Sequence, residues 1–265
     1  MAELIDSGKL NPQELRAIIA QTEGDVYARG FATVSYEELL SDHLKISKEE
    51  VFRRIPMLMI GLTAGLMSPH AVAFATRETE IESPREKRLA VGVVSTRDLK
   101  PEEYGTEGQV DLVADAVTKA MKEAKIENFA DVHCVSVKLP AMTGARVADA
   151  KGRGKSLITE NAGEASTRAK GASALGVAVA LGEVERSKIS DEVINSDFSL
   201  YSSVATTSAG NEQTACRVVL MGNSDKSVSK HVIASGVMKD SLDLPEAKET
   251  IRRAGLSIGD QLSEE

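Results

Sequence analysis

A lysine and a serine in two separate segments of the chain have the surroundings that a Ser-Lys nucleophile needs. Lys138 ends the apolar run VHCVSVK, and no acidic neighbour in sequence keeps its amine charged. Ser208 lies among small residues in TTSAGNE. A serine hydroxyl becomes nucleophilic when a base takes its proton, and burial lowers the pKa of a lysine amine so that it can act as that base. We therefore predict Ser208 as the nucleophile and Lys138 as its base.

The residues around the serine could hold the oxygen of a carbonyl under attack. Thr207, Ala209 and Gly210 flank Ser208, and small side chains let backbone N–H groups approach such an oxygen. We expect these three residues to contact substrate. The alternative for the pair is a strand-end lysine that reaches water and a simple turn hydroxyl, because short motifs often occur without function.

The elements that must position these residues alternate between strands and helices. In the second half of the chain, periodicity predicts strands over 88–95, 130–138, 200–210 and 216–224, and helices over 110–121, 171–184 and 244–256. The Gly- and charge-rich stretch 151–166 is predicted to be a mobile surface loop.

The first half of the chain predicts fewer elements. LRAIIAQ reads as a strand that ends near Gln21, and a helix is expected from a cap at Ser35, with a break near residues 46–47. Two short strands should enclose the bend in MLMIGLTAGLMSPHAVAF. The polar stretch 77–87 contains a proline and resembles an interdomain linker.

Two short motifs recur in the same order and predict an internal repeat. ARGFA at 28–32 matches AKGAS at 169–173, and KISKEEV at 45–51 matches KISDEV at 188–193. Matching order at similar spacing indicates two copies of one structural unit. We expect an α/β fold with two similar domains, each a mixed sheet plus helices, over residues 1–82 and 88–230. Residues 83–87 would form the linker, and residues 231–265 a C-terminal helical segment.

Composition narrows the class of partner. The net charge of −8 and the pI near 5.2 argue against binding to nucleic acid or an anionic membrane surface. The longest apolar stretch, residues 55–66, is too short to span a bilayer, and MAELIDSGKL has no signal-peptide pattern. With only Cys134 and Cys216, the chain fits a reducing cytoplasm. We expect no cofactor and no metal, since His70 has no second ligand at metal spacing.

The ordered motifs of the chain also resemble those of a known family. The motifs are LRAIIAQTEG, YARGF, GLTAGLMSPH, LAVGVVSTRDLKPEEYG, VHCVSVKLP, GASALGVAVALGEV, VATTSAGNE, VVLMGNS and GVMKDSLDLPEA. Their order is similar to that of the ring-opening amidohydrolases, which include cyanuric acid hydrolase and barbiturase. The resemblance implies wedge-shaped domains around a pseudo-threefold axis, each offering a lysine, an arginine and a serine to one central site. It implies hydrolysis of a C–N bond in a planar cyclic amide or imide, with the middle domain's Ser-Lys pair as the catalytic one.

Matched to the family pattern, the middle domain keeps its pair. Lys138 falls on the family lysine and Ser208 on the family serine. Lys170 stands where the family has arginine, which retains the charge but loses the bidentate fork for carbonyl oxygens. The resemblance implies that Lys170 grips a ring carbonyl of the substrate.

The first domain departs further from the pattern. Arg29 matches the family arginine and is expected to bind substrate. Gln21 stands where a lysine is expected, and Ile60 stands where a serine is expected. Because both members of that dyad differ together, this third of the site is expected to have lost or altered its function.

The resemblance also implies a third domain after GVMKDSLDLPEAKETIRRAGL, and the family's C-terminal metal-binding loop has no counterpart in this sequence. We expect a partner subunit, or a second copy of this chain, to supply the missing wedge. Alternatives are a non-catalytic paralogue that stabilises an active subunit and a small-ligand binding protein on the same fold.

Overall fold

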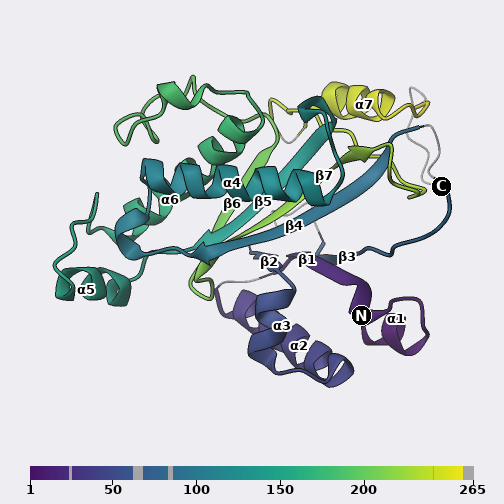
Figure 1. Cartoon of the computed structure of the whole chain (residues 1–265), viewed down its shortest axis with the longest axis horizontal. Helices are drawn as coiled ribbons and strands as arrows, with labels where there is room; N and C mark the ends of the chain where they lie inside the picture. The colour runs from purple at the N-terminus through teal and green to yellow at the C-terminus, as the bar shows by residue number, and fades with distance from the viewer. Residues whose placement is uncertain (24–25, 62–67, 83–85, 241, 259–265) are drawn as a thin grey trace.

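The protein is a four-layered sandwich in which two sheets pack face to face between two layers of helices (Figure 1). The computed structural model describes residues 1–23, 26–61, 68–82, 86–240 and 242–258. Three predicted features lie partly outside this range: the glycine-containing bend at 62–67, residues 83–85 of the linker and residues 259–265 of the tail. Among the described residues, no helix has the length and apolar character needed to cross a membrane.

The first sheet has three strands in the order β2-β1-β3, with β1 parallel to β2 and antiparallel to β3. Ser47 caps α3 by accepting a hydrogen bond from the backbone N–H of Glu50, which explains the helix break predicted at this point. The elements are α1 (Ala2–Asp6), the 3₁₀ helix η1 (Pro12–Glu14), β1 (Leu15–Gln21), α2 (Val26–Leu44), α3 (Lys48–Arg54), β2 (Met57–Ile60) and β3 (His70–Ala75).

The second sheet has four strands in the order β4-β7-β5-β6, with β6 parallel to β5 at one edge. Thr106 and Asn161 cap the two long helices, α4 and α6, that cover its outer face. The elements are β4 (Arg88–Asp98), η2 (Pro101–Glu103), α4 (Glu107–Glu123), η3 (Phe129–Asp131), β5 (Val132–Pro140), α5 (Gly144–Gly152), α6 (Ala162–Ala180), η4 (Arg186–Lys188), β6 (Ala205–Gly210), β7 (Ala215–Ser224) and α7 (Leu244–Arg253).

The two sheets share one topology. In the first, α2 and α3 lie in the chain between the parallel strands β1 and β2, and β3 pairs antiparallel on the other side of β1. In the second, α5 and α6 lie between β5 and β6, and β7 occupies the place of β3. The fold class is therefore mixed α/β with two related mixed sheets, as the sequence predicted.

Three apolar layers hold the sandwich together. Ala17, Leu58 and Val219 are at most 2% exposed and pack between the two sheets. A second layer fills the space between the first sheet and helices α2 and α3, and a third fills the space between the second sheet and helices α4 and α6. Because strand side chains alternate between faces, each strand supplies both an outer layer and the central one.

Local details differ from the sequence expectations. Helix α2 is already present at Val26, so Ser35 lies inside it, where its hydroxyl donates to the Phe31 carbonyl instead of capping. Helix α5 was not predicted; Thr143 caps it, and it takes up residues 151–152 of the expected loop. Helix α6 begins at Ala162, so the loop shortens further. Propensity underestimated both helices because they contain glycine and β-branched residues.

Candidate active site

A row of four side chains crosses the second sheet in register. Ser208 of β6 pairs with Lys138 of β5, Lys138 pairs with Arg217 of β7, and Arg217 pairs with Ser95 of β4. Residues in direct register point to the same face of a sheet, and neighbouring strands lie about 4.8 Å apart. The predicted nucleophile and base are therefore nearest neighbours on adjacent parallel strands.

This row faces the first sheet. The residues on either side of Lys138 belong to the outer core beneath α4 and α6, so Lys138 points the other way. Its amine donates a 2.8 Å hydrogen bond to the backbone carbonyl of Met59 in β2. Arg217 donates to the Arg53 carbonyl at 3.3 Å, and its guanidinium lies 5.1 Å from the ring centre of Phe52. The base is thus held at the boundary between the two sheets.

The environment of Lys138 favours a neutral amine. Its side chain is 1% exposed, and the Glu212 carboxylate lies 3.8 Å from its Nζ. Burial lowers the pKa of the amine; the charge of Glu212 opposes that shift, and the charge of Arg29 adds to it. A lysine whose pKa falls can accept a proton from a neighbouring hydroxyl. The half-buried Ser208 is the hydroxyl on the adjacent strand.

The two predicted substrate-binding cations differ in their placement. Arg29 lies near the start of α2, and its guanidinium rests against Gly61 at the end of β2, close enough to act on the charge of Lys138. Lys170 lies in α6 and is half-buried. Across the described part of the chain, no hydrogen bond or ion pair connects Lys170 to Lys138 or Ser208. The structure therefore brings Arg29 to the base and leaves Lys170 apart from it.

The backbone of β6 separates the residues that flank the serine. Ala141 donates to the carbonyl of Gly210, and Val135 donates to that of Val204. In a parallel pair of strands, every second residue directs both its N–H and its carbonyl to the neighbouring strand. The even-numbered residues of β6 therefore direct both backbone groups toward β5. The Gly210 N–H is thereby engaged in the sheet. The Ala209 N–H instead points to the open edge of β6, where an oxyanion could bind it.

The side chain of Thr207 lies away from this site. Its neighbours Ala205 and Ala209 pack against the outer core, and strand alternation puts Thr207 on the same face. Ser208 occupies the opposite face with Lys138. At Thr207 only the backbone is placed to contact a substrate at the serine.

The first sheet carries the equivalent positions on its facing side. Gln21 pairs in register with Ile60, just as Lys138 pairs with Ser208. The Gln21 amide donates to the Gly61 carbonyl at 3.3 Å. Ile60 follows Met59, whose carbonyl accepts the hydrogen bond from the Lys138 amine. An apolar side chain and a neutral amide therefore occupy, beside the base, the places where a second Ser-Lys pair would lie.

Three polar residues of the site were not predicted from the sequence. Glu212 faces the base, and the buried Gln213 donates to its carboxylate at 3.3 Å. The Gln213 amide oxygen in turn accepts from Nε of Arg217 at 3.4 Å. The available signals were the polar pair that follows the serine bend and one arginine inside the otherwise apolar run ACRVVLM.

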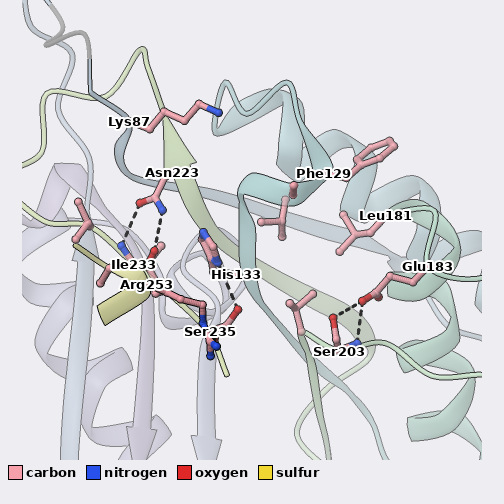
Figure 2. Close-up of a pocket in the computed structure, with 16 residues that line it drawn as sticks. Lys87, Phe129, His133, Leu181, Glu183, Ser203, Asn223, Ile233, Ser235 and Arg253 are labelled. Atoms are coloured by element: carbon pink, nitrogen blue, oxygen red, sulfur yellow. Dashed lines mark hydrogen bonds between the residues drawn. The ribbon is translucent and has the colours of Figure 1, made fainter. Parts of the chain in front are cut away.

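A separate cavity of about 530 Å³ lies at the opposite end of β5 and β6 (Figure 2). Several of its polar side chains pair with one another or with the cavity's backbone: His133 with Ser235, Ser203 with Glu183, and Asn223 with the backbone of Ile233. Within the described ranges, no group of three or more His, Cys, Asp or Glu residues could hold a metal ion. The chemistry-bearing cluster is therefore the one around Lys138.

Comparison with known proteins identifies the family. A model of the amidohydrolase ring-opening protein family matches residues 1–265. The chain belongs to this family. Its relatives in the ring-opening family include a cyclic amide hydrolase of Azorhizobium caulinodans, 45% identical over 269 residues that cover 100% of this chain and 74% of that protein. Barbiturase 1 of a Nocardioides species is 40% identical over 267 residues, covering 97% of this chain and 71% of the relative.

Solved structures of the ring-opening family agree. A cyanuric acid hydrolase structure superposes with a TM-score of 0.90 at 39% identity, covering 96% of this chain and 71% of that chain. A second, from A. caulinodans, gives a TM-score of 0.88 at 36% identity, covering 98% of this chain and 72% of that one. The chain is thus a member of an enzyme family that opens cyclic amides at a C–N bond.

Proposed function

We propose that this chain opens a cyclic amide or imide ring by Ser-Lys nucleophilic catalysis. Lys138 takes the proton of Ser208 as the serine oxygen forms a bond to a ring carbonyl carbon. The ring C–N bond then breaks, and the lysine ammonium returns the proton to the leaving nitrogen. Water, deprotonated by the same lysine, releases the acyl group and restores the serine. The in-register pairing of the two residues on one sheet face carries this proposal.

The remaining groups would position the ring. The Ala209 N–H, at the open edge of β6, would bind the oxyanion that forms at the attacked carbonyl. Arg29 would hold another ring oxygen, since it already lies beside the base. Lys170 lies on α6, over the outer face of β5 and β6, so it would have to reach a further ring carbonyl past the open edge of β6. Preorganised donors of this kind typically supply a few kcal/mol of transition-state stabilisation each.

The substrate would be a ring without threefold polar symmetry. Ile60 presents an apolar side chain near the base, and Gln21 presents a neutral amide already engaged with Gly61. One edge of the ring would therefore carry a CH2 group in place of the third ring N–H, as in barbituric acid, which keeps three carbonyls. We expect barbituric acid to be opened with a higher kcat/KM than cyanuric acid; the reverse preference would contradict this assignment.

We further propose that the exposed apolar surface around α7 binds a partner chain or a second copy of this one, and that this contact completes the site. Val237, Leu242 and Leu244 are 67%, 78% and 47% exposed, and α7 buries none of its residues. Exposed apolar surface of this kind marks an interaction site. Native mass spectrometry should detect an assembly, and a fully active isolated monomer would contradict the proposal.

The decisive test of the chemistry is Ser208→Ala, measured on the assembly with barbituric and cyanuric acid. We expect kcat to fall at least about 10³-fold with the thermal midpoint unchanged. Ser203→Ala is the matched control, because it removes a hydroxyl just before the other end of β6. An assembly that keeps its activity with Ser208→Ala would instead support a non-catalytic, stabilising role.

A further inference from the structure

We propose that Glu212 is a positioning residue that orients Lys138 toward Ser208 and neutralises the lysine when it takes the proton. This inference rests on the proposed function. It is carried by the place of the Glu212 carboxylate, 3.8 Å from Nζ of Lys138 on the side that faces the gap between the sheets. Most glutamate–lysine pairs lie on the protein surface and contribute little. This pair differs because its lysine is buried.

Besides its bond to Cε, the Lys138 nitrogen has three tetrahedral directions. Neighbouring groups lie along two of them. One N–H donates to the Met59 carbonyl at 2.8 Å. A second direction is set by the Glu212 carboxylate. A neutral amine with one N–H bonded to the Met59 carbonyl and the other directed at the Glu212 carboxylate keeps its lone pair for the third direction. Ser208, the register neighbour on β6, lies on the same face to meet it.

The carboxylate is itself held in place. Gln213 is 1% exposed and donates to Glu212 at 3.3 Å. The Gln213 amide cannot easily reverse, because its oxygen accepts from Nε of Arg217, which needs an acceptor. Gly210 has no side chain, and a methyl group there would overlap the carboxylate, with Cδ only 2.5 Å away. Glycine at this position therefore leaves the space that Glu212 occupies.

Charged groups reach Lys138 from three directions. Arg29 reaches it from α2, Arg217 lies opposite it on β7, and Glu212 follows β6. Among the described residues, Glu212 is the anion of this group. When Lys138 becomes an ammonium between two guanidinium groups, Glu212 is the group that compensates the new charge. Its contribution is therefore larger after proton transfer than before, which is the condition for accelerating the step.

The test is Glu212→Gln, compared with Glu212→Asp and with Glu160→Gln. Under the proposed mechanism, turnover of barbituric acid should rise with pH as Lys138 loses its proton. Glu212→Gln removes the negative charge that raises the pKa of the Lys138 amine, so the rising limb of the pH profile should move to lower pH. The plateau kcat should fall about tenfold or more. Glu212→Asp keeps the charge and should keep the limb close to the wild-type position. Glu160 pairs with Lys151 on the surface, so Glu160→Gln should change neither quantity.

A second readout follows the lysine directly. NMR spectra of protein labelled with ¹³C at lysine Cε would show the Lys138 signal, which is assigned because it is missing from the Lys138→Met variant. The titration midpoint of this signal should be lower in Glu212→Gln than in wild type. An unchanged limb, midpoint and kcat would overturn the role of Glu212 even if Ser208→Ala is inactive. An active Ser208→Ala variant would instead remove the proposed function on which the inference rests.

Discussion

The sharpest prediction concerns Gly61, the residue against which Arg29 packs. A Cβ added at Gly61 would overlap the Arg29 guanidinium and would lie 3.2 Å from its Cζ and 3.3 Å from its Cδ. These atoms belong to the flexible end of a long side chain, so Gly61→Ala should displace the guanidinium by about 1 Å while the backbone stays in place. Gly61 lacks the left-handed φ that would strain an alanine.

The size of the effect follows from what Arg29 is proposed to hold. A hydrogen bond to a charged group contributes about 1.5–3 kcal/mol, which corresponds to roughly 10- to 150-fold in kcat/KM if it is lost. Arg29 also lowers the pKa of Lys138, so its displacement should raise that pKa and move the rising limb of the pH profile to higher pH. This shift is opposite in sign to the one expected for Glu212→Gln.

Steady-state kinetics on barbituric acid from pH 5 to pH 10, together with thermal melting, would measure both effects. Arg29→Met should resemble Gly61→Ala, and the double variant should lose little more than either single change, because both act through one guanidinium. Gly152→Ala is the control, since nothing lies within 4 Å of its added methyl. A kcat/KM for Gly61→Ala within twofold of wild type, or strict additivity in the double variant, would refute the placement of Arg29.

Three further outcomes are expected. Lys138→Met should abolish turnover yet raise the free energy of unfolding by about 1–3 kcal/mol at neutral pH, because an amine that is protonated in the unfolded chain costs free energy to desolvate or to deprotonate when it is buried. Burial lowers the folded-state pKa of that amine, so wild-type stability rises as pH passes upward through it, and the gain in urea denaturation should shrink toward alkaline pH. Gly92→Ala should cost about 1–3 kcal/mol, since its methyl would lie 2.7 Å from a backbone carbonyl carbon of α4, whereas Gly152→Ala should change stability by less than about 1 kcal/mol. Hydrogen bonds from Arg153 lower the pKa of Glu102 to about 2, so the stability they provide is present above its ordinary value of 4.5 and is lost as pH falls toward 2; Glu102→Gln should flatten the thermal midpoint over that range.

The proximity of Lys138 and Ser208 was predictable because both residues lie in segments with clear strand patterns. Lys138 ends a run of alternating apolar residues, and Ser208 lies in a short strand of small residues. Once the helical segment between them is recognised, a parallel pairing of the two strands is the expected crossover. Apart from helices α1 and α5, the order of the strands and α-helices in both halves followed from the same periodicities.

The partners of the lysine were not predictable in the same way. The Met59 carbonyl is a backbone group, and no side-chain pattern marks which strand end will meet another sheet. Glu212 and Arg217 lie four and nine residues beyond the serine, and only the turn between β6 and β7 folds them back onto the row. Such contacts depend on tertiary packing, which local sequence does not encode.

The hydrogen bond from Lys138 to the Met59 carbonyl has a consequence for how such a protein can diverge. Every amino acid carries the same main-chain oxygen, so this hydrogen bond can form with any residue at position 59 that preserves strand β2. The N-terminal half could therefore carry other side chains at positions such as Gln21 and Ile60 without releasing the amine that it holds. Neutral drift in one half of the molecule is in this way compatible with retained chemistry in the other.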